Sequence, residues 1–364
     1  MKLPKINIDS IREYLSSIFE DEVSIKYIGE LGKVQRKEEK RLKAFGYGLP
    51  YLIEAEVGGR IRRLVLETIK KGRFGHEHFS DRAQILIWQH SSFNKLPKHV
   101  KSCDLGAFTE VGLKSLGDCR EYFILTEKVE GISYHFDLDR IKEKEKITKL
   151  DLSRCLALSN YLVKIHAKKG KDHHLYVRRA RELIGHGECI MGLIDSYPSN
   201  LSYIDENGLK KIEKMCIEWR YFLKKKAHRL SRVHGDFHPW NILFRKGNDF
   251  TILDRSRGEW GEPADDMASI LINYLFYSLQ VHGKLAEHFE KLFMSFLENY
   301  LEKTKDFELF EVIQPFFAWR GLVIASPIWY PNLSEDVRIK IFNFIHNILN
   351  IDIFDPKNVN SYLI

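Results

Sequence analysis

Strand-like patterns occupy the first part of the chain. Two apolar runs, Tyr51–Val57 and Arg60–Ile69, flank Gly58-Gly59, a pair that is typical of a two-residue β-hairpin turn. Val23–Ile28 is also rich in β-branched and aromatic residues. Phe79–Ser91 instead spaces its apolar residues for one face of a helix. We therefore expect a small antiparallel sheet accompanied by about one helix.

The pattern changes after one more apolar stretch. Glu121–Val129 predicts a further short strand. The later part of the chain shows long amphipathic periods, and Asp151 is expected to cap the first of these helices. We expect an α+β chain of two lobes, in which residues 1–131 form the sheet lobe and residues 132–364 form the larger, mainly helical lobe.

A short hairpin is predicted inside the helical part. Residues 233–256 contain two apolar runs, Ile242–Phe244 and Phe250–Leu253, on either side of a polar turn. Polar residues stand at the ends of both runs. A hairpin that presents polar side chains within a helical domain is a candidate for a catalytic or binding site.

Composition narrows the function classes. The 364 residues are 44% hydrophobic, carry a net charge of +7 and include five cysteines without a C-x-x-C pair. These values exclude a disordered chain and argue against a zinc ribbon or a disulfide framework. No apolar stretch reaches the ~18 residues of a membrane span and no secretion signal follows Met1, so we expect a cytoplasmic protein without a membrane partner. The mild charge gives little support to nucleic-acid binding.

The chemical signal lies between Val233 and Asp254. Asp236 is followed five residues later by Asn241, and Asp254 comes directly after the next apolar run. Phosphoryl transfer needs such a set, because one carboxylate orients and deprotonates the acceptor hydroxyl while other oxygen atoms hold Mg²⁺ against the nucleotide phosphates. Asp236 would be the base, with Asn241 and Asp254 as the metal ligands. Each residue taken alone is more typical of a backbone cap beside a turn.

A second chemical interpretation is a metal site. His234, Asp236 and His238 stand at alternating positions and could present three ligands. A hydrolytic metal centre would need further histidine or cysteine ligands and an open coordination position. The other histidines are distant in sequence, so only the fold could supply them.

The motif resembles the aminoglycoside phosphotransferase and choline kinase family, which has a protein-kinase-like fold. The residue types, order and spacing agree in His234-Gly235-Asp236-x-His238-x-x-Asn241, in Asp254 and in Gly261–Ala268. The resemblance implies that Asp236 is the catalytic base and that Asn241 and Asp254 bind Mg²⁺.

The resemblance also implies two supporting residues. His234 and Asp266 would hold the catalytic loop, and Asp266 would do so from the first turn of a helix that begins near Pro263. The neighbouring Asp265 is better explained as a surface charge at the positive end of that helix.

Nucleotide-binding positions follow from weaker similarities. Phe123–Gly131 resembles the hinge strand that meets adenine through backbone groups, which places Glu127 and Val129 at the nucleotide. Gly46 and Gly48 precede a clear strand, and we expect them to form the loop that covers the phosphates.

The chain departs from the family in its third strand. Where the family carries a lysine that contacts the phosphates, the run Leu64–Ile69 has Glu67. An acid there would repel phosphate unless it binds metal or pairs with a cation. The candidates for the missing cation are Lys70, Lys71, Arg63, Arg255 and Arg257.

Two arginines follow the second proposed metal ligand. A guanidinium suits bidentate phosphate contact, so Arg255 and Arg257 could clamp the γ-phosphate or an anionic substrate. Pairing of both arginines with Glu259 and Glu262 is an equally weighted alternative.

The resemblance implies an ATP- and Mg²⁺-dependent kinase that phosphorylates a hydroxyl of a small metabolite, with GTP as another conceivable donor. A nucleotide-binding pseudokinase or regulatory protein is the alternative that Glu67 motivates. A protein kinase is disfavoured, because no A-P-E ending follows Asp254. Aromatic residues near the C-terminus, among them Trp319 and Tyr330, could box a quaternary amine, but core packing at helical spacing explains them better.

Overall fold

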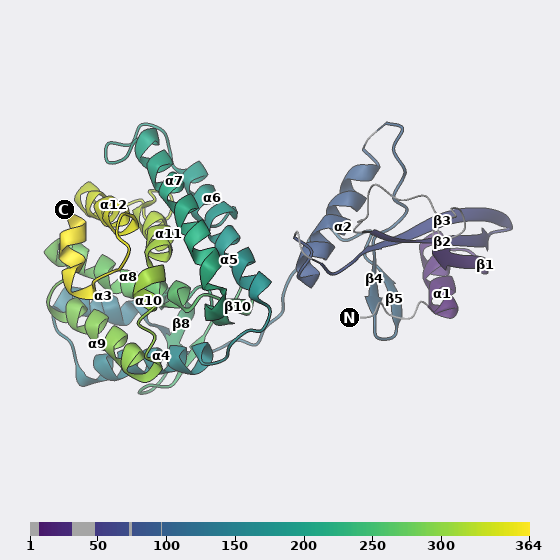
Figure 1. Cartoon of the computed structure of the whole chain (residues 1–364). Coiled ribbons are helices and arrows are strands. Elements are labelled where there is room, and N and C mark those ends of the chain that lie inside the picture. The colour runs from purple at the N-terminus through teal and green to yellow at the C-terminus, as the bar shows by residue number, and fades with distance from the viewer. Residues whose placement is uncertain (1–6, 31–47, 73–74, 96) are drawn as a thin grey trace. The chain divides into compact units, whose positions relative to one another are not determined.

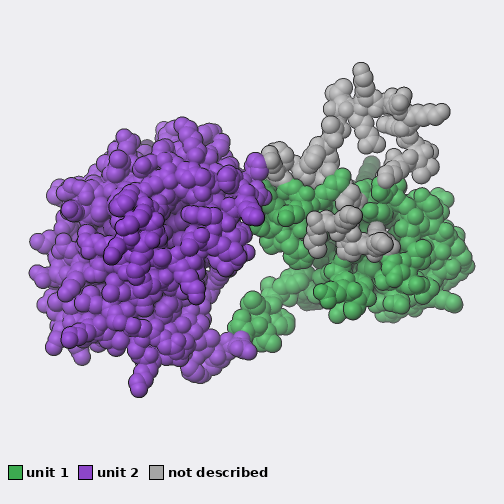
Figure 2. Space-filling view, turned by 60° about the horizontal axis from the view of Figure 1, so that its bottom comes forward, with its two compact units in different colours: residues 1–126 green, residues 127–364 purple. Residues whose placement is uncertain are grey.

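The computed structural model describes residues 7–30, 48–72, 75–95 and 97–364. The chain divides into two compact units, unit 1 with residues 1–126 and unit 2 with residues 127–364 (Figure 2). The border expected between residues 131 and 132 therefore falls slightly inside unit 2. The nucleotide and substrate roles expected for the two parts stay predictions.

Unit 1 is built on an antiparallel sheet with the strand order β1-β2-β3 (Figure 1). Gly58 and Gly59 join β2 to β3 with φ values of +54° and +76°, the backbone that a two-residue hairpin turn requires. Ile11 and Leu15 of α1 are buried in one core with apolar residues of β1 and β2. The predicted hairpin and the helix near residue 79 are confirmed. The elements of unit 1 are α1 (Ile8–Phe19), β1 (Val23–Glu30), β2 (Gly48–Val57), β3 (Arg60–Ile69), α2 (Phe79–Phe93), β4 (Gly106–Thr109) and β5 (Gly112–Ser115).

The strand predicted over Glu121–Val129 does not form. Residues 120–131 lie outside every helix and strand, and the Phe123 side chain is 91% exposed. A strand is stable only when a neighbouring strand takes up its hydrogen bonds. Among the described residues, no strand pairs with this segment, so its apolar composition alone does not produce the expected structure.

Unit 2 is mainly helical and has one large core. Its helices are α3 (His135–Lys144), α4 (Lys149–His166), α5 (His173–Gly185), α6 (Ile190–Ser196), α7 (Glu206–Leu223), α8 (Pro263–His282), α9 (Glu287–Thr304), α10 (Leu309–Val312), α11 (Gln314–Ala325) and α12 (Glu335–Leu349). The 3₁₀ helices are η1 (Lys224–Arg229), η2 (Pro239–Asn241) and η3 (Pro356–Leu363).

Helix α8 lies at the centre of unit 2 and packs against α9 and α11 (Figure 1). Every residue from Pro263 to Leu279 is buried, which explains why this helix shows no polar face. Trp319 is also buried, and the half-buried Tyr330 packs against the same core, so these aromatic residues belong to the core, as expected. The first turn of α8 is therefore held rigidly by packing on all sides.

The start of α4 differs from the sequence expectation. Thr148, rather than Asp151, is the N-cap, and its hydroxyl accepts a hydrogen bond of 3.3 Å from the Asp151 backbone N–H. The Asp151 carboxylate in turn accepts the Thr148 N–H at 2.7 Å. This reciprocal capping box places the acid three residues inside the cap, which sequence spacing alone did not resolve.

Five short strands lie among the helices of unit 2. They are β6 (Ile132–Ser133), β7 (Ser231–Arg232), β8 (Ile242–Phe244), β9 (Phe250–Ile252) and β10 (Trp260–Gly261). The pair β8-β9 is the predicted hairpin, which is confirmed, and β6 extends it into a three-stranded sheet. No helix of the described residues is sufficiently long and apolar to span a bilayer.

Candidate active site

Asp266 holds the loop that precedes η2. It lies in the first turn of α8, is fully buried, and accepts hydrogen bonds from the backbone N–H groups of His234 at 2.8 Å and Gly235 at 2.7 Å. The His166 ring of α4 also contacts this carboxylate, with Nε2 3.0 Å from Oδ2. Burial alone would raise the pKa of Asp266, but the contact with His166 and the charges around it hold the pKa below its ordinary value. The loop backbone is therefore fixed to an ionised carboxylate.

The His234 ring ties the same loop to the β8-β9 hairpin. Its Nε2 lies 3.0 Å from the backbone oxygen of Leu253, and its Nδ1 accepts the Asp236 N–H at 3.2 Å. This pattern requires the proton on Nε2. The ring thus fixes the distance between the Asp236 backbone and the end of β9.

The Asp236 carboxylate has a distinct partner on each oxygen. Oδ1 accepts a hydrogen bond from Nη1 of Arg320, and Oδ2 lies 3.6 Å from Nε2 of His238. Burial would raise the pKa of Asp236, yet the neighbouring His238 and Arg320 hold it well below its ordinary value. Asp236 is therefore ionised near neutral pH, with Oδ1 held by Arg320 and Oδ2 in the longer contact with His238.

Arg320 is a central residue that sequence reasoning missed. It comes from α11, is 7% exposed, and also donates from Nη2 to the Gly235 carbonyl at 2.9 Å and to Asp265 Oδ1 at 2.7 Å. Asp265 is buried and lies 3.8 Å from Arg179, so the expectation of a surface charge at Asp265 is wrong. Its charge is balanced by residues far away in sequence, which local spacing does not reveal.

Asn241 and Asp254 meet across the β8-β9 hairpin. The Leu253 N–H donates to the Asn241 carbonyl at 2.8 Å, which places residue 254 beside Asn241. The Asn241 amide donates to the Asp236 carbonyl at 3.1 Å, and its oxygen takes no part in that bond. Among the described residues, the Asp254 carboxylate forms no hydrogen bond or ion pair, and its backbone is left-handed with φ at +53°. A carboxylate and an amide oxygen without protein donors fit a hard cation such as Mg²⁺.

The alternative metal site on His234, Asp236 and His238 is not formed. Both His234 nitrogens are engaged with the backbone, and His238 Nδ1 accepts the Trp240 N–H at 3.2 Å. No group of three or more histidine, cysteine, aspartate or glutamate side chains within the described ranges is arranged to hold a metal ion. These histidines instead shape the turn that carries Asp236.

Arg255 and Arg257 have different surroundings. Arg255 donates to the carbonyl oxygen of Val233 at 3.1 and 2.7 Å and to that of Glu259 at 3.1 Å. Arg257 lies over the Trp319 ring at 4.8 Å, and its Nη2 is 3.7 Å from the Glu188 carboxylate. The alternative in which both pair with the Glu259 and Glu262 side chains is wrong, since those carboxylates bind Arg232 and Arg229.

The remaining predicted nucleotide contacts lie outside this cluster. Gly46 is outside the described residues. Gly48 begins β2 opposite Ile69, and the exposed Lys70 follows β3. Glu127 is exposed and Val129 half-buried in the segment before β6. Their contact with a nucleotide stays a prediction.

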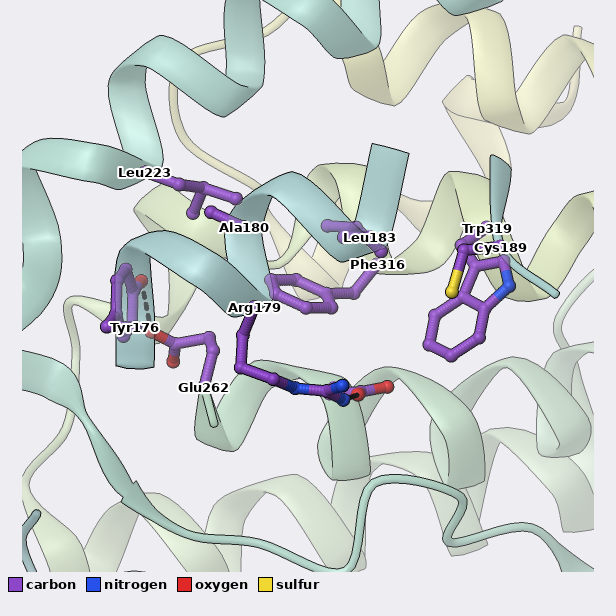
Figure 3. Close-up of a pocket in the computed structure, with 10 residues that line it drawn as sticks. Tyr176, Arg179, Ala180, Leu183, Cys189, Leu223, Glu262, Phe316 and Trp319 are labelled. Carbon is purple, nitrogen blue, oxygen red and sulfur yellow. Dashed lines mark hydrogen bonds and ion pairs between the residues drawn. The ribbon is translucent and has the colours of Figure 1, made fainter. Parts of the chain in front are cut away.

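A pocket lies beside the cluster in unit 2, between α5, α8 and α11 (Figure 3). Arg179 extends from α5 below the Phe316 ring, and Trp319 stands near Cys189 on the opposite wall. Glu262 accepts a hydrogen bond of 2.6 Å from the Tyr176 hydroxyl, which links α5 to the start of α8. The pocket therefore combines apolar walls with the Arg179–Asp265 pair next to the site.

Comparison with known families agrees with this geometry. Residues 197–301 match the model described as "Phosphotransferase enzyme family", and this range contains the loop, the hairpin and the start of α8. This part of the chain is similar to that phosphotransferase enzyme family. The resemblance inferred from the sequence is thereby confirmed, together with the α+β fold class. The match supports a small-molecule phosphotransferase.

Several solved kinases of small molecules are similar to this chain at low identity. A glucosamine kinase in complex with glucosamine, ADP and inorganic phosphate is 14% identical with a TM-score of 0.37, over 63% of this chain and 61% of that one. An aminoglycoside phosphotransferase is 15% identical with a TM-score of 0.36, over 94% and 98%. A choline kinase from Streptococcus pneumoniae is 12% identical with a TM-score of 0.35, over 94% and 98%. No curated protein matches the chain.

Proposed function

We propose that this phosphotransferase moves the γ-phosphate of ATP to a hydroxyl of a small metabolite, with Mg²⁺ as cofactor. The observation that carries the proposal is the arrangement around the β8-β9 hairpin. An ionised, backbone-anchored Asp236 lies next to Asn241, and Asn241 lies next to an unpaired Asp254. These are the parts that phosphoryl transfer requires, a group that orients the hydroxyl and oxygen ligands for the metal.

Asp236 is assigned the role of base. Arg320 holds Oδ1, so Oδ2 is the oxygen that remains to accept the acceptor hydroxyl. As the hydroxyl oxygen bonds to the γ-phosphorus and the bond to the bridging oxygen breaks, ADP leaves and the hydroxyl proton passes to Asp236. Its low pKa makes it a weak base, so its main contribution is orientation of the hydroxyl.

Asn241 and Asp254 are assigned the metal site. Their side-chain oxygens would hold Mg²⁺, which when bound neutralises charge on the phosphates. His234 and Asp266 support both groups, because they fix the loop to the end of β9 and to α8.

Thermal unfolding with nucleotide tests the metal and nucleotide part of the proposal. Mg·ATP should raise the melting temperature by about 5 °C or more at saturation, with Mg·GTP measured alongside. Asp254→Asn should abolish the rise while keeping the left-handed turn. Asp249→Asn removes an equal charge from the exposed hairpin turn and should leave the rise intact. Absence of any rise in the unaltered protein would contradict the proposal.

Turnover separates an enzyme from a nucleotide-binding regulator. Release of ADP in the presence of hydroxylated metabolites should fall about 10²-fold or more in Asp236→Asn, while nucleotide still raises the melting temperature. A protein that binds Mg·ATP but shows the same ADP release with and without Asp236 would instead be a pseudokinase.

A further inference from the structure

Arg257 has buried donors without acceptors. Its Nε and Nη1 are shielded from solvent and have no hydrogen-bond partner in the described part of the chain. Its one acidic contact, Glu188, lies 3.7 Å away and has a side chain that is 66% exposed. Buried donors are almost always paired in proteins, and a missing partner costs free energy. Such donors are typical of a site that a ligand completes.

The surrounding charges leave Arg257 unbalanced. Arg320 is paired with Asp236 and Asp265, and Arg179 is paired with Glu182 at 3.1 Å. Cys189 also lies close by, but burial raises the pKa of its thiol to about 12 despite the nearby arginines, so it carries no charge. Among the described residues, Arg257 therefore has only the distant and exposed Glu188 as an ion-pair partner.

The Arg257 guanidinium is held in place next to Asp236. It stacks over Trp319, and Trp319 is fixed by a hydrogen bond of 3.2 Å from its indole N–H to the Glu188 carbonyl. A Cβ atom at Gly235 would lie 3.3 Å from Cβ of Arg257, which shows how closely the two backbones approach. Arg320, which holds Asp236, stacks over the same indole at 3.8 Å and has its own unpaired Nε.

The position of Arg257 indicates which ligand it meets. Its contacts come from α11 and from Glu188, which precedes α6, whereas the proposed metal ligands lie at the ends of β8 and β9. An anion bound by Arg257 therefore approaches Asp236 from the helices, the side on which the pocket of Figure 3 lies. The acceptor can occupy this side, because the proposed metal site, and with it the nucleotide phosphates, lies at the β8-β9 hairpin.

We propose that the acceptor is an anion-bearing alcohol, whose carboxylate or phosphate group is bound by Arg257 while its hydroxyl meets Asp236. This inference rests on the proposed phosphotransferase function and narrows its substrate class. A guanidinium suits both anions through charge-assisted hydrogen bonds, and the indole below it excludes water from one face. Neutral polyols would leave the charge of Arg257 unbalanced, and polyamines would add a like charge beside it.

A binding measurement tests the anion site without turnover. Inorganic phosphate and malonate are titrated against the full chain while the melting temperature is followed, with glycerol as the neutral probe. We expect a rise with one or both anions and none with glycerol. Arg257→Gln should abolish the rise, and Arg257→Lys should reduce it. Arg232→Gln removes a charge from a neighbouring arginine paired with Glu259 and should keep it.

Two outcomes of this titration would overturn the inference. One is the absence of any anion-dependent rise, and the other is an equal rise in Arg257→Gln. The comparison of phosphate with malonate shows which anion the site takes. The nucleotide titration of Asp254→Asn is independent of Arg257, so failure of the anion site is distinguishable from failure of the phosphotransferase proposal.

Kinetics distinguish an acceptor anion from the γ-phosphate. Hydroxy acids, phosphorylated alcohols and their neutral analogues are compared as acceptors by ADP release. Arg257→Gln should lower kcat/KM for an anionic acceptor about 10- to 100-fold, mainly through KM, and leave KM for Mg·ATP unchanged. A rise in KM for Mg·ATP, or a preference for neutral acceptors that Arg257→Gln does not alter, would refute the assignment.

Discussion

Residues 233–238 and residues 254–258 are adjacent in space but differ in how their polar groups are satisfied. In the first segment, the backbone and the Asp236 side chain bind Asp266, His234 and Arg320. In the second, Asp254 is unpaired within the described residues and Arg257 has two buried donors without acceptors. The difference teaches that the protein itself preorganises the first segment, while the second keeps polar groups without protein partners, as the proposed ligand sites require.

The largest effect is expected when the support of Asp236 is removed. Arg320→Met leaves Asp236 and Asp265 without their shared cation, which should cost about 3–5 kcal/mol of unfolding free energy. Urea unfolding measures this loss, and Arg320→Lys, which keeps the charge, should lose less. An unchanged stability would mean that the first segment is not held by this ion pair.

The same variant changes the pH dependence. Since Arg320 helps to hold the pKa of Asp236 below its ordinary value, Arg320→Met should raise that pKa. The acid limb of turnover should then move to higher pH. In the unaltered protein, the stabilising contribution of Asp236 is present above about pH 4 and is lost at lower pH. In the variant, the unfolding free energy should not fall in this way as the pH is lowered. If the acid limb does not move, His238 rather than Arg320 holds the pKa of Asp236 low.

A smaller effect is expected when the loop loses its anchor in α8. Asp266→Asn keeps the size of the side chain but turns one acceptor oxygen into a donor, which then faces a backbone N–H of His234 or Gly235. We expect a loss of about 2–3 kcal/mol in urea unfolding and a fall in kcat with little change in nucleotide affinity. A fall in nucleotide affinity of the same size would show that the anchor also positions the second segment.

The smallest effect compares the two arginines of the second segment. Arg255→Gln removes hydrogen bonds to two backbone carbonyls and should lower the unfolding free energy by about 1 kcal/mol. Arg257→Gln loses the stacking on Trp319 but also removes two unpaired buried donors, so the two effects offset and the unfolding free energy should change by less than about 0.5 kcal/mol in the absence of ligand. Chemical denaturation of both variants measures the contrast, and equal losses would refute it.

Local patterns in the sequence were sufficient for much of the structure. The Gly58-Gly59 hairpin and the β8-β9 hairpin follow from the residues of the turn itself. The order and spacing of the motif residues also led to the phosphotransferase family. These features depend on neighbours within a few residues or on a continuous segment, which a sequence displays directly.

The parts that were missed depend on distant partners. Arg320 and Asp236 are 84 positions apart in the sequence, and no local pattern predicts their contact. Asp265 was expected at the surface, because an acidic residue at the start of a helix usually interacts favourably with the helix dipole from an exposed position. Helix α8 is instead buried from its first turn. Glu121–Val129 has the composition of a strand, but strand formation depends on a partner that composition does not supply.

The left-handed backbone of Asp254 has a consequence for evolution and engineering. A residue with a Cβ atom at φ +53° carries a conformational cost of roughly 1 kcal/mol, which glycine would avoid. Asp254→Gly would thus favour the turn while deleting the carboxylate. Selection for heat resistance alone would enrich this replacement, and under the proposed metal role of Asp254 the resulting protein would be more stable but inactive. Stability screening of this chain should therefore be combined with an activity measurement at this one position.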